Sequence, residues 1–304
     1  MMEELKQNLI AFFASSELNR LHENYGGGRI FCDPLIGVAS GDDPIYQKYK
    51  EVVGPEHFTP LELWQVEGQN TVSASKLRVI SIIFPFSNEI REESKNIIKL
   101  NRLILPAEIY SVARNYANEF KQETCRQIIK ILEDKGYNGV AGLLSKNFTI
   151  IMKGRFYSNW SERHSAFAAG LGTFSLHEAL ITDVGCNVRI GSVITDAPLE
   201  ITPRKSDEPY GNCLFFFNGT CKKCVEKCPA GAISEKGHDK NECSFYGQKL
   251  SRKVNSRIGS ILKPHYRYIN GELRKQAPPV GCAFCQFGVP CMDKNPTASL
   301  KNKI

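Results

Sequence analysis

Residues 221–229 read CKKCVEKCP, and this stretch decides how the C-terminal third of the chain is interpreted. Its spacing, Cys-x2-Cys-x3-Cys-Pro, suits a tight turn that presents several thiolates to one iron–sulfur cluster. The neighbouring sequence extends the set to eight cysteines: Cys213, Cys221, Cys224, Cys228, Cys243, Cys282, Cys285 and Cys291. Two [4Fe–4S] clusters need eight thiolates, four each. The pattern therefore predicts two clusters and one-electron chemistry.

The run is the second half of the bacterial ferredoxin signature, in which the cysteine before proline binds the other cluster. Pro229 prevents the chain from folding back at that point. This rule gives a first cluster group of Cys213, Cys221, Cys224 and Cys291. The second cluster group is then Cys228, Cys243, Cys282 and Cys285. Asn218 stands where the signature has its first cysteine, and we expect Cys213 to replace it through a loop over 214–220.

Disulfides and zinc are the alternative uses of so many cysteines. A disulfide framework suits small secreted domains, whereas 304 residues can bury a full core without such links. Eight thiolates could also form two all-cysteine zinc sites. The run over 221–229 is unlike paired zinc knuckles, however, and Cys213 and Cys243 stand apart from any CxxC pair. The sequence therefore favours iron–sulfur clusters over both.

Composition and the N-terminus indicate where the protein works. The chain carries 39 Lys and Arg against 32 Asp and Glu, a formal charge of +7, without a long basic run. Glu3 and Glu4 stand where a secretory signal would be positively charged, and no apolar stretch is long enough to cross a bilayer. We expect a reducing, cytoplasmic location. The three remaining cysteines are interpreted as small buried hydrophobic residues: Cys32, Cys125 and Cys186.

Periodicity and turn residues predict an α+β fold. The expected helices span 3–22, ended by the glycines at 26–28, then 106–135, capped by Gly136, and 161–169, capped by Asn159 or Ser161. The expected strands span 77–86, 137–144 and 188–195. We expect a mixed α/β domain over 1–200, a proline-rich joint over 198–209, and a ferredoxin-like double-cluster domain over 201–304.

Three further segments, followed by the double-cluster region, carry a family resemblance. They are RVIS (78–81) ending at Pro85, ERHSAFAAGLG (162–172) and GSVITD (191–196). Over roughly 75–295 the chain resembles the epoxyqueuosine reductases, which are related to the reductive dehalogenases. The resemblance implies a nitroreductase-like N-terminal domain that binds base-off cobalamin. It also implies that two [4Fe–4S] clusters supply electrons to the cobalt for a two-electron reduction of substrate.

The resemblance directs attention to the glycine-containing turns as cofactor contacts. A glycine lets the backbone approach a large flat ligand closely, and small hydroxyl groups could bind the amide fringe of a corrin. We therefore expect cofactor contacts from Gly170, Leu171, Gly172, Thr173, Gly191 and Ser192. His164 beside Arg163 is expected to face a phosphate or carboxamide of the cofactor, and its alternative role is a histidine satisfied within its own helix. The alternative is that these glycines are helix caps and strand bulges.

The chain departs from the family at two points. The aspartate that donates a proton in epoxyqueuosine reductases corresponds to Phe156, so we expect the adjacent Tyr157 to donate instead, assisted by Arg155 and Arg163. Few residues follow Cys291, so the helical-repeat extension that many tRNA-acting members use is not expected. This makes tRNA a disfavoured partner.

The sequence thus predicts a cytoplasmic iron–sulfur reductase that passes electrons to a corrinoid and reduces a small-molecule or nucleoside substrate. The expected partner is a low-potential donor such as ferredoxin or flavodoxin. One rival is an electron-transfer adaptor without its own substrate, which would have a filled N-terminal core. The other is a flavin-dependent reductase, because the nitroreductase-like fold also accommodates FMN.

Overall fold

A four-stranded antiparallel sheet organises the protein. The computed structural model describes residues 1–101, 103–152, 156–205, 207–269 and 272–301. The sheet order is β1 (Leu35–Ser40), β2 (Arg78–Pro85), β10 (Val188–Thr195) and β5 (Gly139–Val140). Seven of the eight residues of β2 are buried, and since successive side chains point to opposite faces, the sheet is covered on both sides. The α+β class predicted from the sequence is confirmed.

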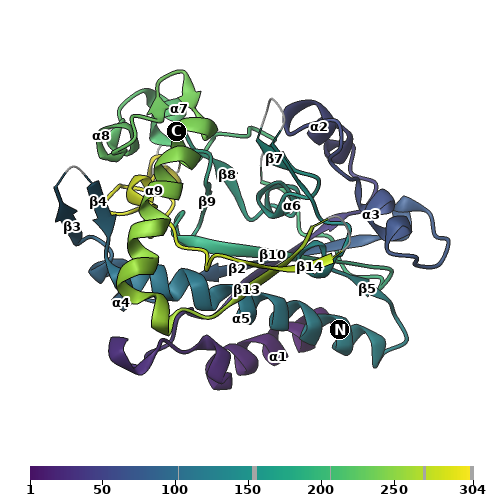
Figure 1. The fold of residues 1–304 in the computed structure, drawn as a ribbon. Coiled ribbons are helices and arrows are strands. Elements are labelled where there is room, and N and C mark those ends of the chain that lie inside the picture. The colour runs from purple at the N-terminus through teal and green to yellow at the C-terminus, as the bar shows by residue number, and fades with distance from the viewer. Residues whose placement is uncertain (102, 153–155, 206, 270–271, 302–304) are drawn as a thin grey trace.

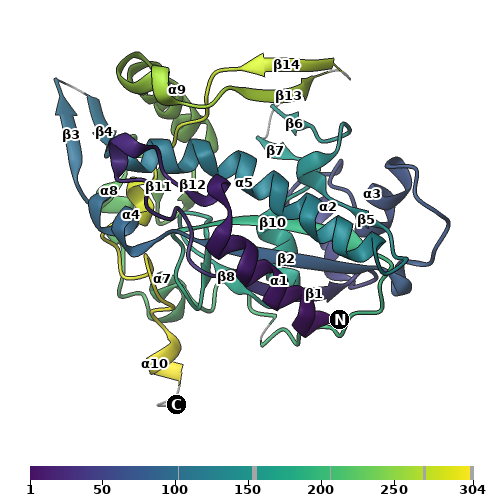
Figure 2. The same cartoon turned by 90° about the horizontal axis from the view of Figure 1, so that it is seen from below.

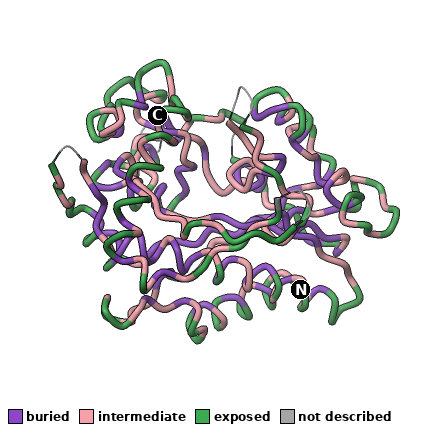
Figure 3. Tube along the Cα trace, viewed as in Figure 1, coloured by how far each residue is buried: buried purple, intermediate pink, exposed green. Residues whose placement is uncertain are grey.

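Helices cover the two faces of the sheet. The long helix α5 (Glu108–Glu133) and α1 (Met2–Ser15) lie on one face, and α6 (Glu162–Ala168) packs on the other (Figures 1 and 2). Phe13 of α1 stacks on Phe84 of β2 and meets Phe120 of α5 edge to face, with ring centroids 5.3 Å and 4.8 Å apart. These aromatic contacts join the three elements into one core. Figure 3 shows the buried residues along the sheet and the inner side of α5.

The predicted elements agree closely with the structure in some places and differ in others. Helix α5 ends before Gly136, which has φ +83° and donates its N–H to Glu133 O at 2.9 Å, as predicted. Helix α1 stops at Ser15, short of the predicted residue 22, because Ser16 adopts an extended conformation and caps a 3₁₀ turn over Glu17–Asn19. The strand predicted over 137–144 is only β5, followed by a 3₁₀ turn over Gly142–Leu144.

The C-terminal third packs directly against the sheet layer. Helix α9 (Lys240–Ile258) crosses α5 and packs against it (Figure 1), where Leu250 and Val254 join the same hydrophobic core as Phe120. The core therefore continues past residue 200, and the domain boundary there stays a prediction. The segment expected as a loop over 214–220 is instead the short helix α7 (Leu214–Asn218), ended by Gly219 at φ +74°.

The remaining elements are short and surround the sheet. They are helices α2 (Ile45–Val52), α3 (Pro60–Val66), α4 (Asn88–Glu93), α8 (Lys223–Lys227) and α10 (Ala298–Lys301), and the strand pairs β3 (Ile97–Leu100) with β4 (Leu103–Pro106), β6 (Ile150–Ile151) with β7 (Tyr157–Ser158), β8 (Gly172–Phe174) with β9 (Leu180–Thr182), β11 (Ile233–Ser234) with β12 (Gly237–His238), and β13 (His265–Ile269) with β14 (Glu272–Gln276). Among the described residues, no helix combines the length and apolar character needed to cross a membrane.

Candidate functional site

The first cluster group gathers around the start of α8. Cys213 precedes α7, Cys221 and Cys224 flank the start of α8, and Cys291 comes from the C-terminal loop. Burial raises the pKa of Cys224 to about 12, and negative charge on Cys291, Cys213 and Cys221 adds to the effect. The four thiols are thus electrostatic neighbours, although Cys291 is distant from the others in sequence.

The second cluster group lines a cavity of about 480 Å³, here called the thiol cavity. All four of its members are among the lining residues: Cys228, Cys243, Cys282 and Cys285. Burial raises the pKa of Cys282 to about 12, with further contributions from Cys243 and Cys228. All eleven cysteines lie within the described ranges as free thiols. The structure brings these cysteines into one region, and Cys228 and Cys285 also pack with Cys213, Cys224 and Cys291. The partition into two groups and cluster binding therefore stay predictions.

Cationic side chains form much of the remaining wall of the thiol cavity. Arg114, Lys121, Arg163 and Arg189 line it, with Glu162 as the acidic member. Burial lowers the pKa of Lys121 and raises the pKa of Glu162. A thiolate-ligated cluster carries net negative charge, and buried charges are tolerated where opposite charges compensate them. The lining of the thiol cavity therefore fits an anionic iron–sulfur cluster.

A second cavity, here called the large cavity, lies between α2, α6, the β6–β7 pair and the joint after residue 200. Its volume is about 1270 Å³, above the range of about 300–1,000 Å³ typical of small-molecule sites. Apolar groups dominate part of its wall, including Ile45, Val53, Phe148, Phe167 and Phe174. Polar groups are interspersed among them, including Tyr49, Ser158, Ser161, His164 and Arg204. A large cofactor with an apolar face and an amide fringe fits such a lining.

The two cavities share a wall. Arg163, His238 and Cys243 line both of them. Cys243 belongs to the second cluster group, so a cluster held there would lie beside the large cavity. Arg163 also donates to the backbone oxygen of Glu178, which lines the large cavity. This shared wall is the feature that connects the thiol-rich region with the N-terminal fold.

Two of the predicted cofactor residues and the predicted proton donor line the large cavity. Arg163 and His164 reach it from α6, and His164 Nδ1 lies 2.7 Å from Ser161 Oγ. Tyr157 reaches it from β7 and donates its phenolic hydrogen to Glu56. Arg155, the second cation expected beside this tyrosine, lies outside the described residues.

The other predicted cofactor residues are absent from the described lining of the large cavity: Gly170, Leu171, Gly172, Thr173, Gly191 and Ser192. Gly170, at φ +72°, ends α6, which agrees with the alternative interpretation that these glycines are helix caps. At Gly172 a Cβ would lie only 2.4 Å from the backbone oxygen of Ile181 in the paired strand. The close approach that this glycine permits is thus between two strands, and a cofactor role for it stays a prediction.

The hydroxyl groups and the strand glycine of the same set also contact protein. Thr173 Oγ1 accepts from the backbone N–H of Asn212 at 2.8 Å. Ser192 Oγ accepts from Trp160 Nε1 at 3.0 Å and donates to Glu162 at 2.5 Å. A Cβ on Gly191 would meet the Phe84 ring at 3.4 Å, inside the core. These residues support the sheet behind the cavities.

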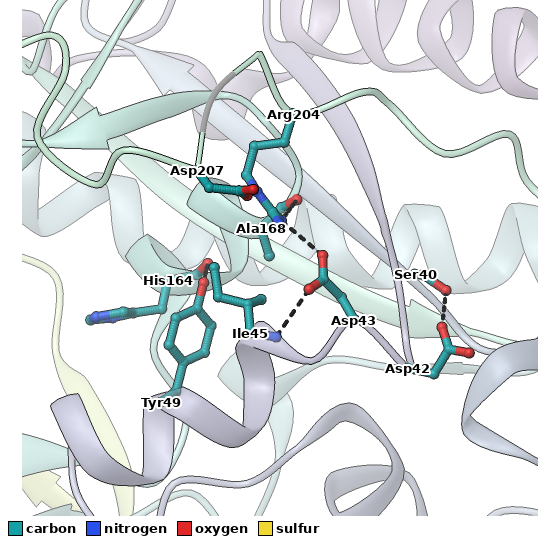
Figure 4. Close-up of polar contacts among 9 residues, drawn as sticks. All are labelled: Ser40, Asp42, Asp43, Ile45, Tyr49, His164, Ala168, Arg204 and Asp207. Carbon is teal, nitrogen blue, oxygen red and sulfur yellow. Dashed lines mark hydrogen bonds and ion pairs between the residues drawn. The ribbon is translucent and has the colours of Figure 1, made fainter.

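The joint after residue 200 contributes an ion-pair network that sequence reasoning missed. Arg204 donates to Asp43 at 2.8 Å, to Asp207 at 2.7 Å and to the backbone oxygen of Ala168 at 3.2 Å (Figure 4). Arg204 and Asp43 line the large cavity and hold the start of α2 against the end of α6. The prolines of this segment were interpreted as a linker, and a lone arginine within it gives no sequence signal.

The three cysteines outside the two groups have different environments. Cys125 is buried against β10, as predicted, and its sulfur lies 4.0 Å from the backbone oxygen of Ser192. Cys32 is exposed, so its prediction as a buried hydrophobic residue is wrong. It follows the buried Phe31, whose side chain points into the core, and the alternation of an extended chain turns the next side chain outward. Cys186 is buried, as predicted, and contacts Cys291.

Comparison with known proteins confirms the resemblance inferred from the sequence. No family model matches the chain. A tetrachloroethene reductive dehalogenase from Sulfurospirillum multivorans is 42% identical over 71 residues, which is 23% of this chain and 13% of that protein. The chain therefore spans only a small part of this curated relative.

Solved structures give likenesses to the same two groups of proteins. A selenomethionine-labelled epoxyqueuosine reductase shares 16% identity with a TM-score of 0.49, covering 98% of this chain and 71% of that one. An epoxyqueuosine reductase from Bacillus subtilis shares 15% identity with a TM-score of 0.49, covering 98% and 70%. A catabolic reductive dehalogenase in complex with 3-bromo-4-hydroxybenzoic acid shares 16% identity with a TM-score of 0.43, covering 81% and 34%. The chain is similar to epoxyqueuosine reductases and reductive dehalogenases.

Proposed function

We propose that this protein is an iron–sulfur reductase whose two cluster groups hold two [4Fe–4S] clusters and whose large cavity holds a corrinoid. The wall shared by Arg163, His238 and Cys243 carries the proposal. It puts a predicted cluster ligand beside a cavity whose volume exceeds that of ordinary small-molecule sites. Electrons delivered to the thiol region have a short route into this cavity.

Some residues of the large cavity would hold a cofactor, and others would act on a substrate. A bound corrinoid would supply two-electron reduction at its cobalt, and the clusters would supply single electrons. His164 and Ser161 present polar atoms to the cavity, whereas Phe167 and Phe174 offer apolar surface. Tyr157 is the proposed proton donor, because it lines the large cavity and carries a phenolic O–H, which hydrogen-bonds to Glu56.

The cavity also bears on the rival functions. An adaptor without substrate chemistry would have a filled N-terminal core, and the large cavity argues against it. A flavin could occupy the same space, so the absorption spectrum of the released cofactor decides between flavin and corrinoid.

We propose ferredoxin or flavodoxin as the electron donor and a small molecule or nucleoside as the substrate. We also propose a cytoplasmic location, because such clusters are sensitive to oxygen and the cytoplasm is a reducing compartment.

Protein purified or reconstituted without oxygen is expected to contain about eight irons and eight sulfides per chain, four of each per cluster. Cobalamin added to this protein should bind one molecule per chain and shift its visible spectrum. Metal analysis and anaerobic equilibrium dialysis measure both quantities. Iron at half that level, or stoichiometric zinc, would reject the cluster assignment. A released flavin or a failure to bind cobalamin would reject the corrinoid.

Filling the large cavity should separate cofactor binding from cluster binding. Val52, the last residue of α2, lines the cavity and is 54% exposed, so a larger side chain there can enter it without displacing the core. Val52→Trp is expected to weaken cobalamin binding at least tenfold, since about 1.4 kcal/mol of lost contact suffices for that change. Its iron content should stay unchanged.

Val66 offers a matched control for that substitution. It is the last residue of α3, is 44% exposed and is absent from the described lining of the large cavity. Val66→Trp should bind cobalamin with the affinity of the wild type. Equal weakening in both variants would show that the large cavity does not hold the cofactor.

A further inference from the structure

Two residues outside both cluster groups meet a member of the first cluster group. His177 Nε2 lies 3.8 Å from Cys291 Sγ, and Cys186 Sγ lies 3.8 Å from the same sulfur. The three side-chain ligand atoms lie within 4.8 Å of one another. His177 and Cys186 are buried, with 5% and 2% of their surface exposed. Two potential donors thus converge on one predicted ligand sulfur.

The backbone holds this contact in place. The N–H of Cys186 donates to the oxygen of Cys291 at 2.8 Å, and the N–H of Asn187 donates to the oxygen of Met292 at 3.0 Å. The turn that leads to Cys186 closes where Thr182 Oγ1 donates to Gly185 O at 2.7 Å. Cys186 is therefore fixed beside Cys291 by two backbone hydrogen bonds and a built turn.

The chemistry of the three groups decides between a separate metal site and a hydrogen-bonding role. A mononuclear site would have to take Cys291 away from the first cluster group, which would then have only three thiols. A thiol S–H and an imidazole N–H can instead donate to a sulfur that is already bound to iron. Hydrogen bonds to cluster sulfurs are one of the means by which proteins set reduction potentials.

We propose that His177 and Cys186 donate hydrogen bonds to the sulfur of Cys291 and thereby raise the reduction potential of the cluster held by the first cluster group. The inference rests on the proposed function, because it requires that cluster. Reduction adds a negative charge to the cluster, and a donor stabilises the more negative state more strongly. Cys186 acts through Cys291 and is a positioning residue, distinct from the eight ligands.

Each donor residue is tested with a pair of substitutions, one that removes the hydrogen-bond donor and one that keeps a donor. Cys186→Ala removes the donor, whereas Cys186→Ser keeps a hydroxyl group of similar size. His177→Leu removes the ring N–H, whereas His177→Gln keeps an amide N–H. Each donor-free variant is expected to lower the ratio of reduced to oxidised cluster about tenfold at a fixed potential, which equals about 59 mV for one electron. The donor-keeping variants should stay closer to the wild type.

The measurement is a potentiometric titration of anaerobic, cluster-loaded protein followed by electron paramagnetic resonance. The same titration follows the cluster of the second cluster group, because His177 and Cys186 also line the thiol cavity; the larger shift is expected for the first cluster, whose ligand Cys291 they contact. Cys125→Ala is the matched control: it also removes a buried thiol, but from a site against β10. Iron analysis on every variant shows whether both clusters are retained.

Each outcome is decisive for the inference. Lowered potentials in Cys186→Ala and His177→Leu, with full iron content, support it. Unchanged potentials in both variants overturn it. Loss of about four irons in Cys186→Ala would make Cys186 a ligand and overturn it as well. Wild-type protein that cannot be loaded with clusters would instead reject the proposed function, so the two failures are distinguishable.

Discussion

Replacing Cys282 by alanine is expected to remove one cluster and leave the other, so that iron falls from about eight to about four per chain. Cys282 lines the thiol cavity with the other three members of the second cluster group. A cubane that has lost one of its four thiolates should be lost from the protein. Cys224→Ala should also leave about four irons, but in the opposite cluster.

Double variants test which cysteines bind the same cluster. Cys213→Ala combined with Cys224→Ala removes two ligands from one group, so about four irons should remain. Cys224→Ala combined with Cys282→Ala removes one ligand from each group, so iron should fall to background. Reduction of added cobalamin by a chemically reduced ferredoxin is expected to fall to background in every one of these variants, because the electron route is broken.

Cys125→Ala provides the control, since it should keep all eight irons and the full rate of cobalamin reduction. The partition would be contradicted if the Cys213 and Cys224 pair lost all iron. Retention of eight irons in Cys213→Ala would show that Cys213 does not replace the cysteine missing at Asn218. Circular dichroism on each variant establishes that the fold persists.

The elements predicted most accurately are those with strong local signals. Strand β10 has the predicted bounds, and β2 lies within the predicted 77–86, where apolar residues continue on both faces. Helix α5 follows the helical period of its apolar residues and ends before Gly136. The two cysteine groups rest on a local signal as well, because neighbouring cluster ligands must come from a tight turn and their spacing encodes it, but they stay a prediction.

The contacts of the cavities could not be predicted in the same way. Gly172 and Gly191 give the same sequence signal whether a cofactor or a protein atom takes the place of the missing side chain. In the structure that space belongs to Ile181 and to the Phe84 ring. Cys186 and Cys291 are separated by 105 positions, and their contact follows from tertiary folding alone. Sequence spacing carries no information on such pairs.

Gly185→Ala is expected to lower the free energy of unfolding strongly and to loosen the first cluster group. Gly185 has φ +84°, and a Cβ there would lie 2.3 Å from the oxygen of Met292 and 2.5 Å from the N of Asp293. The left-handed conformation costs an alanine about 1–2 kcal/mol, and the collision should add about 1–3 kcal/mol. Because both clashing atoms belong to backbone, the segment that carries Cys291 must move.

Gly136→Ala is the control that carries the conformational cost of Gly185→Ala without its steric collision. Gly136 has φ +83°, and a Cβ added there would meet no atom within 4 Å, so only the conformational cost of about 1–2 kcal/mol applies. Denaturant unfolding under nitrogen should show the larger loss for Gly185→Ala. Iron release to a chelator should also be faster in that variant, since its displaced segment supplies a ligand of the first cluster group. Equal stability and equal iron release in the two variants would show that the turn at Gly185 does not hold Cys291 in place.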